Sequence, residues 1–363
     1  MRAMLLVIAW SVLVVSPSIA AEKQRRFLLD EEFSWMDRAA ADQLVSKAKR
    51  AGFNVIVPCV WHGRGVTWRS SLPREPRWID NANPLGDPLA YLIKRAHEEG
   101  IEVHPWFTLV KRQRDFYSEF ADPGVPEDAF DVHNQQFRRL IRDVVLEVVE
   151  KYPVDGINLD YVRSRGICVS EKCKADYRVR TGRNLSSDSL SYRFLPEAKE
   201  SISSWNRTAV EDLLVSISSA IRAKVPAAII SLSSHAGYEP LRLEGTNSIA
   251  WANAGLVDYI LHIEYAQLDA IRYDLLDAAL TSMKNPAQLI MIAGNYEFEQ
   301  GNPSHVWPRD HLEVGKVIKF ATTFNPSQHS AALYEYRFLT EAQIAAIAAE
   351  WGSPGPTIGN ANQ

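Results

Sequence analysis

The sequence predicts an α/β protein whose single domain is a (β/α)8 (TIM) barrel with long loops on its C-terminal face. Short apolar runs alternate with longer amphipathic runs almost to the end of the chain, eight of the short runs are present, and 363 residues of 46% hydrophobic content can bury a core of that size. Such alternation implies parallel strands joined by right-handed crossovers. We expect the barrel to span residues 22–351. A doubly wound open sheet is the alternative, but no Gly-rich turn follows the first run, RFLLD.

Each predicted strand is a short apolar run rich in β-branched or aromatic residues. The eight runs are 26–30, 53–61, 101–109, 154–162, 228–236, 257–266, 289–297 and 330–338. Between them, apolar residues recur at helical spacing, and several of these segments begin with Asp, Asn or Thr and end at Gly or before Pro. The predicted helices are 36–52, 87–100, 134–152, 205–225, 273–285, 309–324 and 340–351. We expect the Gly- and Pro-containing tail, residues 352–363, to be disordered.

The N-terminal segment is typical of a secretory signal peptide. It carries an early Arg2, an apolar run from Met4 to Val15, and small residues up to Ala21. We expect residues 1–21 to be removed and the mature protein to be secreted or periplasmic, with no stable membrane insertion. A retained anchor is the alternative, although the apolar run is short for a membrane span. A net charge of −4 without blocks of like charge argues against nucleic acid as a partner.

Two predicted connections, 61–84 and 163–203, are longer than a barrel needs. Both follow strands, so both belong to the C-terminal face, where barrel active sites are built. The second contains Cys168 and Cys173, which in an oxidising compartment can form a local disulfide and leave Cys59 as a buried thiol. A zinc site is disfavoured, because the chain has neither a CxxC motif nor paired histidines near these cysteines. We expect no metal and no cofactor.

The stretch VDGINLDYVRSRG, residues 154–166, places two carboxylates in an apolar strand. Side chains alternate across a strand, so Asn158 and Asp160 share one face. Asp160 lies near the C-terminal end of the strand, which in a barrel opens into the active site, and a catalytic role is favoured there. Asp155 lies at the opposite end, where a turn or a strand-end cap explains a carboxylate as well as a role in the site does.

Other predicted strands also end in polar or aromatic residues. The candidate catalytic carboxylates are Asp160, Glu264, Glu297 and Glu335. The candidate substrate-binding residues are Trp61, His62, His104, Trp106, Asn158, Tyr161, Arg163, His235, His262, Tyr265, Asn295, Tyr296 and Tyr336. Taken singly, each polar residue fits a core or rim ion pair as well as a role in the site, and each aromatic residue fits core packing better than sugar binding. Several buried polar groups converging on one barrel face call for a polar pocket, and flat aromatic rings suit the C–H faces of sugars.

Glycoside hydrolysis needs two carboxyl groups flanking the scissile bond, one to protonate the leaving oxygen and one to act as nucleophile or to activate water. Asp160 and Glu264 come from non-adjacent predicted strands that face each other across one barrel mouth. Glu297 and Glu335 compete with Glu264 as the second carboxylate. An acid beside an aromatic ring such as Tyr265 can have the raised pKa that a proton donor requires.

The segment VDGINLDYVR, residues 154–163, resembles the fourth-strand signature DGIxLDYIRY of glycosyl hydrolase-like family ten, a group of exported glycosidases with a (β/α)8 fold. GFNVIVPCVWHGRG (52–65) resembles the second strand of that family, and DPLAYLIKRAHEEGIEVHPWF (87–107) resembles its segment leading into the third strand. The likeness covers the mature chain through the fourth strand and is vaguer beyond it. It implies a barrel, a carbohydrate substrate and a catalytic Asp160, but does not identify the partner of Asp160.

Two more distant resemblances are incomplete. The fourth strand resembles the DGxRxD strand of α-amylase-type enzymes, but Asn158 stands in place of the arginine, and the fifth strand has no glutamate to match the amylase acid. It also resembles the chitinase-type DGxDxDxE motif, but Val162 occupies the position of the acid. The chain therefore lacks the complete catalytic set of either group.

The sequence predicts a glycoside hydrolase that cleaves a poly- or oligosaccharide with a carboxylate pair centred on Asp160. A non-catalytic carbohydrate-binding barrel would keep the aromatic residues and long loops without a matched acid pair. A metal-dependent hydrolase or deacetylase would use His62, His104, His235 or His262 with Asp160 as ligands. It is the least favoured alternative, because no HxH occurs in the first predicted strand and no HExxH in the chain.

Overall fold

The computed structural model describes residues 24–68, 70, 86–113, 115–238, 242–325 and 329–352. The predicted signal peptide 1–21, most of the predicted connection 61–84 and the tail beyond Gly352 lie outside the described residues. Within the described part of the chain, no helix is both long and apolar enough to span a bilayer.

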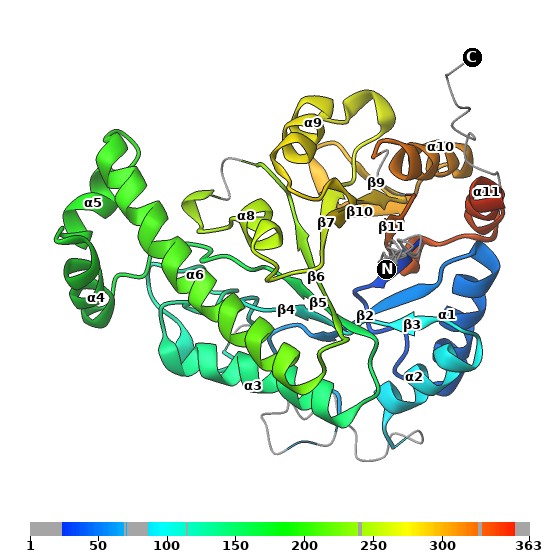
Figure 1. Ribbon diagram of the computed structural model, residues 1–363, viewed down its shortest axis with the longest axis horizontal. Helices are drawn as coiled ribbons and strands as arrows, with labels where there is room; N and C mark the ends of the chain where they lie inside the picture. Colours follow the sequence, from blue (N-terminus) through cyan, green and yellow to red (C-terminus); the bar gives the residue numbers. More distant parts are fainter. Residues whose placement is uncertain are drawn as a thin grey trace, which may run out of the picture.

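A closed parallel barrel forms the centre of the molecule, and this confirms the predicted fold class (Figure 1). Its strands are β1 (Arg26–Asp30), β2 (Val55–Trp61), β3 (Glu102–Val103), β4 (Trp106–Thr108), β5 (Gly156–Asp160), β6 (Ile229–Ser234), β7 (Tyr259–Glu264), β8 (Leu289–Gly294) and β11 (Ala331–Tyr334). β1 pairs with both β2 and β11, which closes the sheet. β3 and β4 together occupy the third of eight strand positions around the barrel, because both pair with β2. Because the barrel is closed, none of these strand positions has an unpaired edge.

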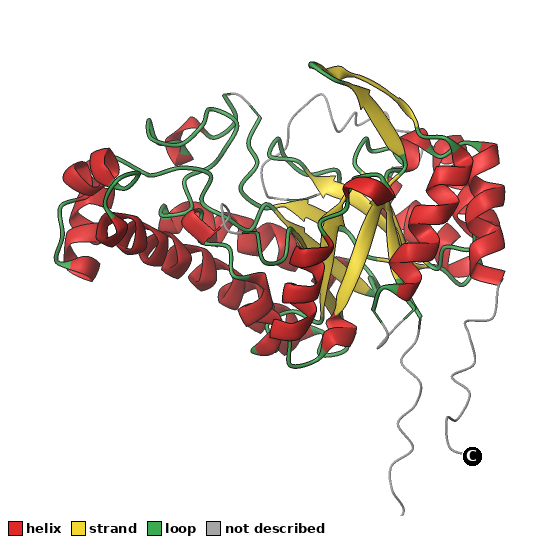
Figure 2. Cartoon of the chain, turned by 90° about the horizontal axis from the view of Figure 1, so that it is seen from above, coloured by secondary structure: helices red, strands yellow, loops and turns green. Residues whose placement is uncertain are grey.

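Helices surround the barrel on its outer side (Figures 1 and 2). They are α1 (Arg38–Ala51), α2 (Pro88–Glu98), α3 (Gln135–Lys151), α4 (Glu171–Thr181), α5 (Leu185–Ser191), α6 (Pro196–Lys224), α8 (Ser248–Asn253), α9 (Tyr273–Ser282), α10 (His311–Thr323) and α11 (Glu341–Gly352). Five of them begin where an Asp or Asn side chain accepts a hydrogen bond from a first-turn backbone N–H, which stabilises the helix start. These caps are Asp37, Asp87, Asn134, Asn184 and Asp310.

The longer helices that pack on the barrel, α1, α2, α3 and α10, each bury one apolar stripe, as the helical spacing predicted. In α3 the buried side chains are Phe137, Ile141, Val144, Val145, Val148 and Val149, which recur every three or four residues. This stripe belongs to the main core, and α3 packs beside α6 on the outside of the barrel. Most of the stability of such a helix comes from burial of this stripe and not from intrinsic helix propensity.

Two predicted strands are interrupted. The predicted strand 101–109 is divided into β3 and β4, and Pro105, which has no N–H to donate, lies between them. The predicted strand 289–297 ends at Gly294. The chain beyond it turns outward into an antiparallel hairpin of β9 (Tyr296–Glu299) and β10 (Asn302–Pro308), which projects from the barrel in Figure 2.

The predicted long connection 163–203 is mostly helical, which the sequence pattern did not indicate. It contains α4, α5 and the first part of α6, which form the lobe on the left of Figure 1. This lobe has a second, smaller core made of Cys168, Cys173, Tyr177, Leu185, Ile202 and Trp205. α4 buries only Cys173 and Tyr177, so it carries too few apolar positions to show a helical period.

The interior of the barrel is not purely apolar. Asn158 donates from Nδ2 to Ser231 Oγ at 2.9 Å and accepts at Oδ1 from Ser233 Oγ at 3.0 Å. Nearer the N-terminal end of the barrel, buried His104 lies with its Nε2 3.2 Å from Glu102 Oε2. The partners of the Asn158 amide and of His104 Nε2 satisfy polar groups whose burial would otherwise be costly.

Gly156 is required by the close packing of the barrel interior. A Cβ atom at this position would lie 2.7 Å from two ring atoms of His104 and from the backbone oxygen of Ile229. We expect Gly156→Ala to lower the free energy of unfolding by about 1–3 kcal/mol through overpacking. Gly315→Ala in α10 is the matched control, since its Cβ would make only an ordinary 3.6 Å contact with Ala346. We expect that control to be neutral or to stabilise by up to about 1 kcal/mol. Urea denaturation of both variants measures the difference, and equal stability of the two would contradict the overpacking argument.

Candidate active site

A cavity of about 200 Å³ opens at the C-terminal ends of the barrel strands. The side chains that line it come from the ends of β1, β4, β5, β6, β7 and β11 and from the loops that follow them. They are Glu31, Trp106, Asp160, Tyr161, Val162, Arg163, Leu232, Ser233, Ser234, His235, Thr246, Ile263, Tyr265 and Tyr334. The cavity therefore lies where a barrel of this kind builds its active site.

Asp160, the last residue of β5, lies in the wall of this cavity and is nearly buried. Its Oδ1 accepts a 2.6 Å hydrogen bond from the backbone N–H of Tyr161, a residue in the left-handed backbone region at φ 52°. Burial raises the pKa of Asp160 to about 7, and the negative charge of Glu31 contributes to the rise, while the N–H bond and Arg163 oppose it. Near neutral pH this carboxyl group therefore holds a proton on a substantial fraction of molecules.

Glu31 follows β1 and faces the same cavity. Its Oε1 lies 3.1 Å from His62 Nε2 and 3.6 Å from Lys111 Nζ, and its Oε2 accepts a hydrogen bond from the hydroxyl of Tyr334. Burial acts to raise the pKa of Glu31, but the contacts with His62 and Tyr334 and the charge of Lys111 outweigh it and lower the pKa to about 2. Glu31 is thus ionised over the whole physiological range.

The two carboxyl groups of the cavity have pKa values moved in opposite directions by their surroundings. One group that stays ionised and one that retains its proton is the arrangement found where carboxylates divide the roles of base or nucleophile and acid. The two pKa values differ because the surroundings of the two groups differ. Glu31 has three cationic or hydrogen-donating neighbours, whereas Asp160 is buried and lies near the negative charge of Glu31.

Aromatic rings form one wall of the cavity. Tyr265 and Tyr334 are stacked with ring centroids 4.9 Å apart, and Trp106 meets Tyr334 edge-on at 6.3 Å. Tyr296 packs behind this wall, 5.9 Å from Tyr265 and 5.8 Å from Tyr334. At the rim, the guanidinium of Arg163 lies 4.7 Å from the ring centre of Tyr161.

The structure brings six of the predicted site residues together around the cavity: Trp106, Asp160, Tyr161, Arg163, His235 and Tyr265. His62 adjoins the cavity through its contact with Glu31. His235 directs Nδ1 toward the backbone oxygen of Ile263 at 3.1 Å, and burial lowers its pKa. The roles of these residues in binding or catalysis stay predictions.

The other predicted substrate-binding residues do not line the cavity. Trp61 is fully buried against Phe116, and Asn158 and His104 are held in the barrel interior as described above. His262 accepts the backbone N–H of Ala236 at 3.0 Å, and burial lowers its pKa to about 3, so it is a neutral acceptor. Asn295 bonds to the backbone N–H of Glu335 and to Gln343, and Tyr336 lies under Lys47 of α1.

The three predicted glutamates also lie outside the cavity lining. Glu264 accepts the backbone N–H of Ala266 at 3.1 Å. Glu297 is carried on the β9–β10 hairpin, where its Oε1 accepts a 2.8 Å hydrogen bond from Gln267. Glu335 follows β11, and burial raises its pKa to about 8, with the charge of Glu31 adding to the effect. The catalytic roles of these three residues stay predictions.

Glu31, Tyr334 and Lys111 are the site residues that sequence reasoning missed. A signal for Glu31 was present, because three consecutive acids, Asp30, Glu31 and Glu32, occur where the first predicted strand ends. Glu31 lies at the end of the first predicted strand, as Asp160 lies at the end of the fourth, so the same positional criterion selects both residues. Tyr334 had no such signal, since a tyrosine in an apolar strand normally indicates packing.

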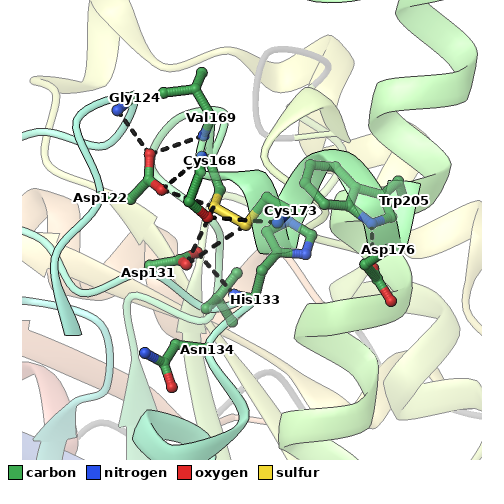
Figure 3. Close-up of a disulfide and its surroundings, with 12 residues drawn as sticks. Asp122, Gly124, Asp131, His133, Asn134, Cys168, Val169, Cys173, Asp176 and Trp205 are labelled. Carbon is green, nitrogen blue, oxygen red and sulfur yellow. Dashed lines mark hydrogen bonds between the residues drawn. A yellow bond between two sulfur atoms is a disulfide. The ribbon is translucent and has the colours of Figure 1, made fainter. Parts of the chain in front are cut away.

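A disulfide joins Cys168 and Cys173 (Figure 3), with the two Cα atoms 6.0 Å apart, and Cys59 is a buried free thiol. Together with Asp122 and Asp131, the two cysteines form the one group of four buried potential metal ligands found among the described residues. None of these four side chains lines the cavity.

Similar proteins share both the sequence pattern and the fold. The model of the family described as glycosyl hydrolase-like 10 matches residues 29–306. Glycosyl hydrolase DigH of Escherichia coli K12 is 22% identical, over 94% of this chain and 83% of that protein. The glycoside hydrolase domain of PgaB (BpsB) from Bordetella bronchiseptica superimposes with a TM-score of 0.65 at 11% identity, covering 90% of this chain and 98% of that one.

A further solved structure of the same architecture is the catalytic domain of β-amylase from Paenibacillus polymyxa, with a TM-score of 0.57 at 11% identity over 90% of this chain and 97% of that one. At these identities the solved structures establish the barrel architecture alone. The family match covers most of the chain and includes both Glu31 and Asp160. This protein therefore belongs to the glycosyl hydrolase-like 10 family.

Proposed function

We propose that this protein is a glycoside hydrolase that cleaves an oligo- or polysaccharide with Asp160 as proton donor and Glu31 as the ionised carboxylate. The observation that carries the proposal is the pair of carboxyl groups in one cavity, with the pKa of Asp160 raised to about 7 and that of Glu31 lowered to about 2. The family and the barrel fold support hydrolysis of a glycosidic bond as the reaction class.

In this proposal, Asp160 transfers its proton to the glycosidic oxygen as the bond from that oxygen to the anomeric carbon breaks. The departing sugar leaves as a neutral alcohol, and positive charge develops on the anomeric carbon and ring oxygen. The negative charge of Glu31 faces that developing charge, either stabilising it while water attacks or bonding to the carbon before water does. Water supplies the hydroxyl group of the new reducing end, and its second proton restores the acid.

The cavity wall fits a sugar ring. Stacked Tyr265 and Tyr334 offer flat apolar faces, and Ser233, Ser234 and Thr246 offer hydroxyl groups on the other lining segments. The volume of about 200 Å³ is below the ~300–1,000 Å³ of pockets that enclose drug-sized ligands. The cavity therefore encloses one sugar unit, and the rest of the glycan lies across the open face of the barrel.

Replacing the proton donor tests the first half of the pair. We expect Asp160→Asn to lower the rate of hydrolysis by roughly 10²–10⁴-fold, because the amide cannot donate a proton to the leaving oxygen. The measurement is release of reducing ends from a panel of polysaccharides, with wild type and variant matched for folding by circular dichroism. Equal activity in the two proteins would remove Asp160 from the mechanism and favour a carbohydrate-binding barrel.

A second comparison identifies the partner carboxylate. We expect Glu31→Gln to lose activity to a similar extent as Asp160→Asn, because the neutral amide cannot stabilise the developing positive charge. Glu264→Gln, a strand-end glutamate that does not line the cavity, is the matched comparison, and we expect it to keep activity within about threefold. The same assay reads both variants. If Glu264→Gln were the inactive one, the pair would be the one that the sequence alone suggested.

The pKa values set the pH dependence. Because the pKa of Asp160 is raised and its protonated form is the active one, kcat/KM falls as pH rises through about 7, tenfold per pH unit. The acid limb reports Glu31 and lies near pH 2. Since the charge of Arg163 lowers the pKa of Asp160, we expect Arg163→Gln to move the alkaline limb to higher pH. A pH–rate profile of each protein measures the limb, and a shift to lower pH in the variant would refute the assignment.

A further inference from the structure

Three buried polar side chains form a hydrogen-bonded group next to the aromatic wall, and none of them lines the cavity. They are Asn295, Arg309 and Gln343, which we call the wall network. Asn295 and Arg309 flank the β9–β10 hairpin, and Gln343 belongs to α11. Burial of a guanidinium group and two amides is costly unless their hydrogen bonds are satisfied. The partners of these side chains therefore identify what the network holds in place.

Arg309 joins the ends of two neighbouring barrel strands. Its Nη1 donates to the backbone oxygen of Gly294 at 2.8 Å, and its Nη2 donates to the backbone oxygen of Tyr265 at 2.8 Å. Nη1 also lies 3.4 Å from the backbone oxygen of Ala266. The ion pair with Glu297 is longer, at 3.7 Å, so the short contacts of the guanidinium group are those with the backbone. β8 ends at Gly294 and Tyr265 directly follows β7, so one planar group fixes the two chain segments relative to each other.

Gly294 allows Tyr265 to lie close against the end of β8. A Cβ atom on Gly294 would lie 3.0 Å from Tyr265 Cβ, and 3.1 Å from its Cα and from its backbone oxygen. A side chain at this position would push Tyr265 away from β8, so the glycine permits the close packing. Together with the hydrogen bond from Arg309, this packing fixes the backbone from which the ring of Tyr265 projects.

Asn295 holds the backbone of the second ring of the wall, Tyr334. The backbone N–H of Asn295 donates to the backbone oxygen of Tyr334 at 3.0 Å, and its Oδ1 accepts the backbone N–H of Glu335 at 2.7 Å. This oxygen and this N–H belong to one peptide group, so Asn295 bonds both polar atoms of the peptide group that follows the ring.

Gln343 joins the two halves of the network. Its Oε1 accepts from Asn295 Nδ2 at 3.1 Å, and its Nε2 donates to the backbone oxygens of Asn295 at 3.1 Å and Arg309 at 2.7 Å. The backbone N–H of Arg309 donates to the same oxygen of Asn295 at 2.9 Å. The supports of the two stacked rings are therefore one hydrogen-bonded unit, which is anchored to α11.

We propose that Arg309 is a positioning residue, which fixes Tyr265 so that its ring stays stacked on Tyr334 in the wall that the sugar contacts. This role rests on the proposed function, in which the stack binds a sugar ring. The two rings lie 4.9 Å apart with their planes at 17°. A stacked pair presents the same surface to a ligand only while this distance and angle are kept. Asn295 and Gln343 hold Arg309 itself, since they bond its backbone N–H and its backbone oxygen.

The kinetics of Arg309→Lys test this role, because lysine keeps the charge but lacks the planar fork that bridges two backbone oxygens. The substrate is the polysaccharide of the panel that wild type cleaves fastest. We expect KM to rise roughly 3–10-fold and kcat to stay within about twofold, because the stack contacts the sugar before and during bond cleavage alike. In a Tyr265→Ala background the same substitution should leave KM unchanged, because its effect passes through that ring. The matched control is Arg222→Lys, with unchanged KM expected: Arg222 donates to Ala228 and Asp258 just before β6 and β7, at the opposite end of the barrel.

Fluorine NMR of protein labelled with 3-fluorotyrosine reports the position of the ring and needs no substrate. The Tyr265 resonance is identified by its loss in Tyr265→Phe. We expect this resonance to shift or broaden in Arg309→Lys and to stay in place in Arg222→Lys, because its frequency depends on the distance and tilt of the neighbouring aromatic rings. If Arg309→Lys does not fold, Gln343→Met takes its place, since it removes the hydrogen bond to the backbone oxygen of Arg309 and leaves the wall residues unchanged.

Three results would overturn the role of Arg309. One is an unchanged Tyr265 resonance in the folded variant, and another is an unchanged KM. The third is an equal rise in KM with and without the Tyr265 ring, which would indicate a general structural effect. If wild type hydrolyses no polysaccharide of the panel while the resonance responds as expected, the proposed function fails and the support of the wall by Arg309 stands.

Discussion

The negative charge of Glu31 is the interaction on which the chemistry of the barrel mouth depends. It is maintained inside a low-polarity cavity by His62, Lys111 and Tyr334. From there it acts on its neighbours, raising the pKa of Asp160, Glu335 and Tyr265 among others. Burial is the largest cause of each of these rises in pKa, and the negative charge of Glu31 adds to it.

Closure of the barrel is what allows this coupling. Glu31 and Asp160 are 129 residues apart in the sequence. They face one cavity because β1 and β5 run in the same direction within one closed barrel. Inside the barrel, the side chain of Asn158 hydrogen-bonds to the two serines of β6. The carboxyl groups of the proposed pair lie farther along, at the C-terminal ends of the strands. Residues that stabilise the barrel and residues proposed for catalysis thus lie at different heights along the same strands.

The fold could be predicted because the alternation of strand and helix patterns extends over most of the chain. A local interruption in one element does not hide that alternation. Asp160 could be predicted by strand parity and position. The partner that we propose for it could not, because Glu264 and Glu31 meet the same sequence criterion and only the positions of the loops distinguish a cavity-lining glutamate from one that accepts a backbone N–H. Pro105 and the outward turn after Gly294 show the same limit, since local backbone chemistry overrides an apolar pattern there. α4 and α5 were missed because their few buried residues pack within a separate lobe.

That lobe has a core of its own, closed at its base by Cys168 and Cys173, while the cavity takes its residues from Tyr161 to Arg163 just before it. The lobe is therefore packed around contacts of its own, and substitutions on its outer surface are expected to leave the strand end that carries Asp160 in place.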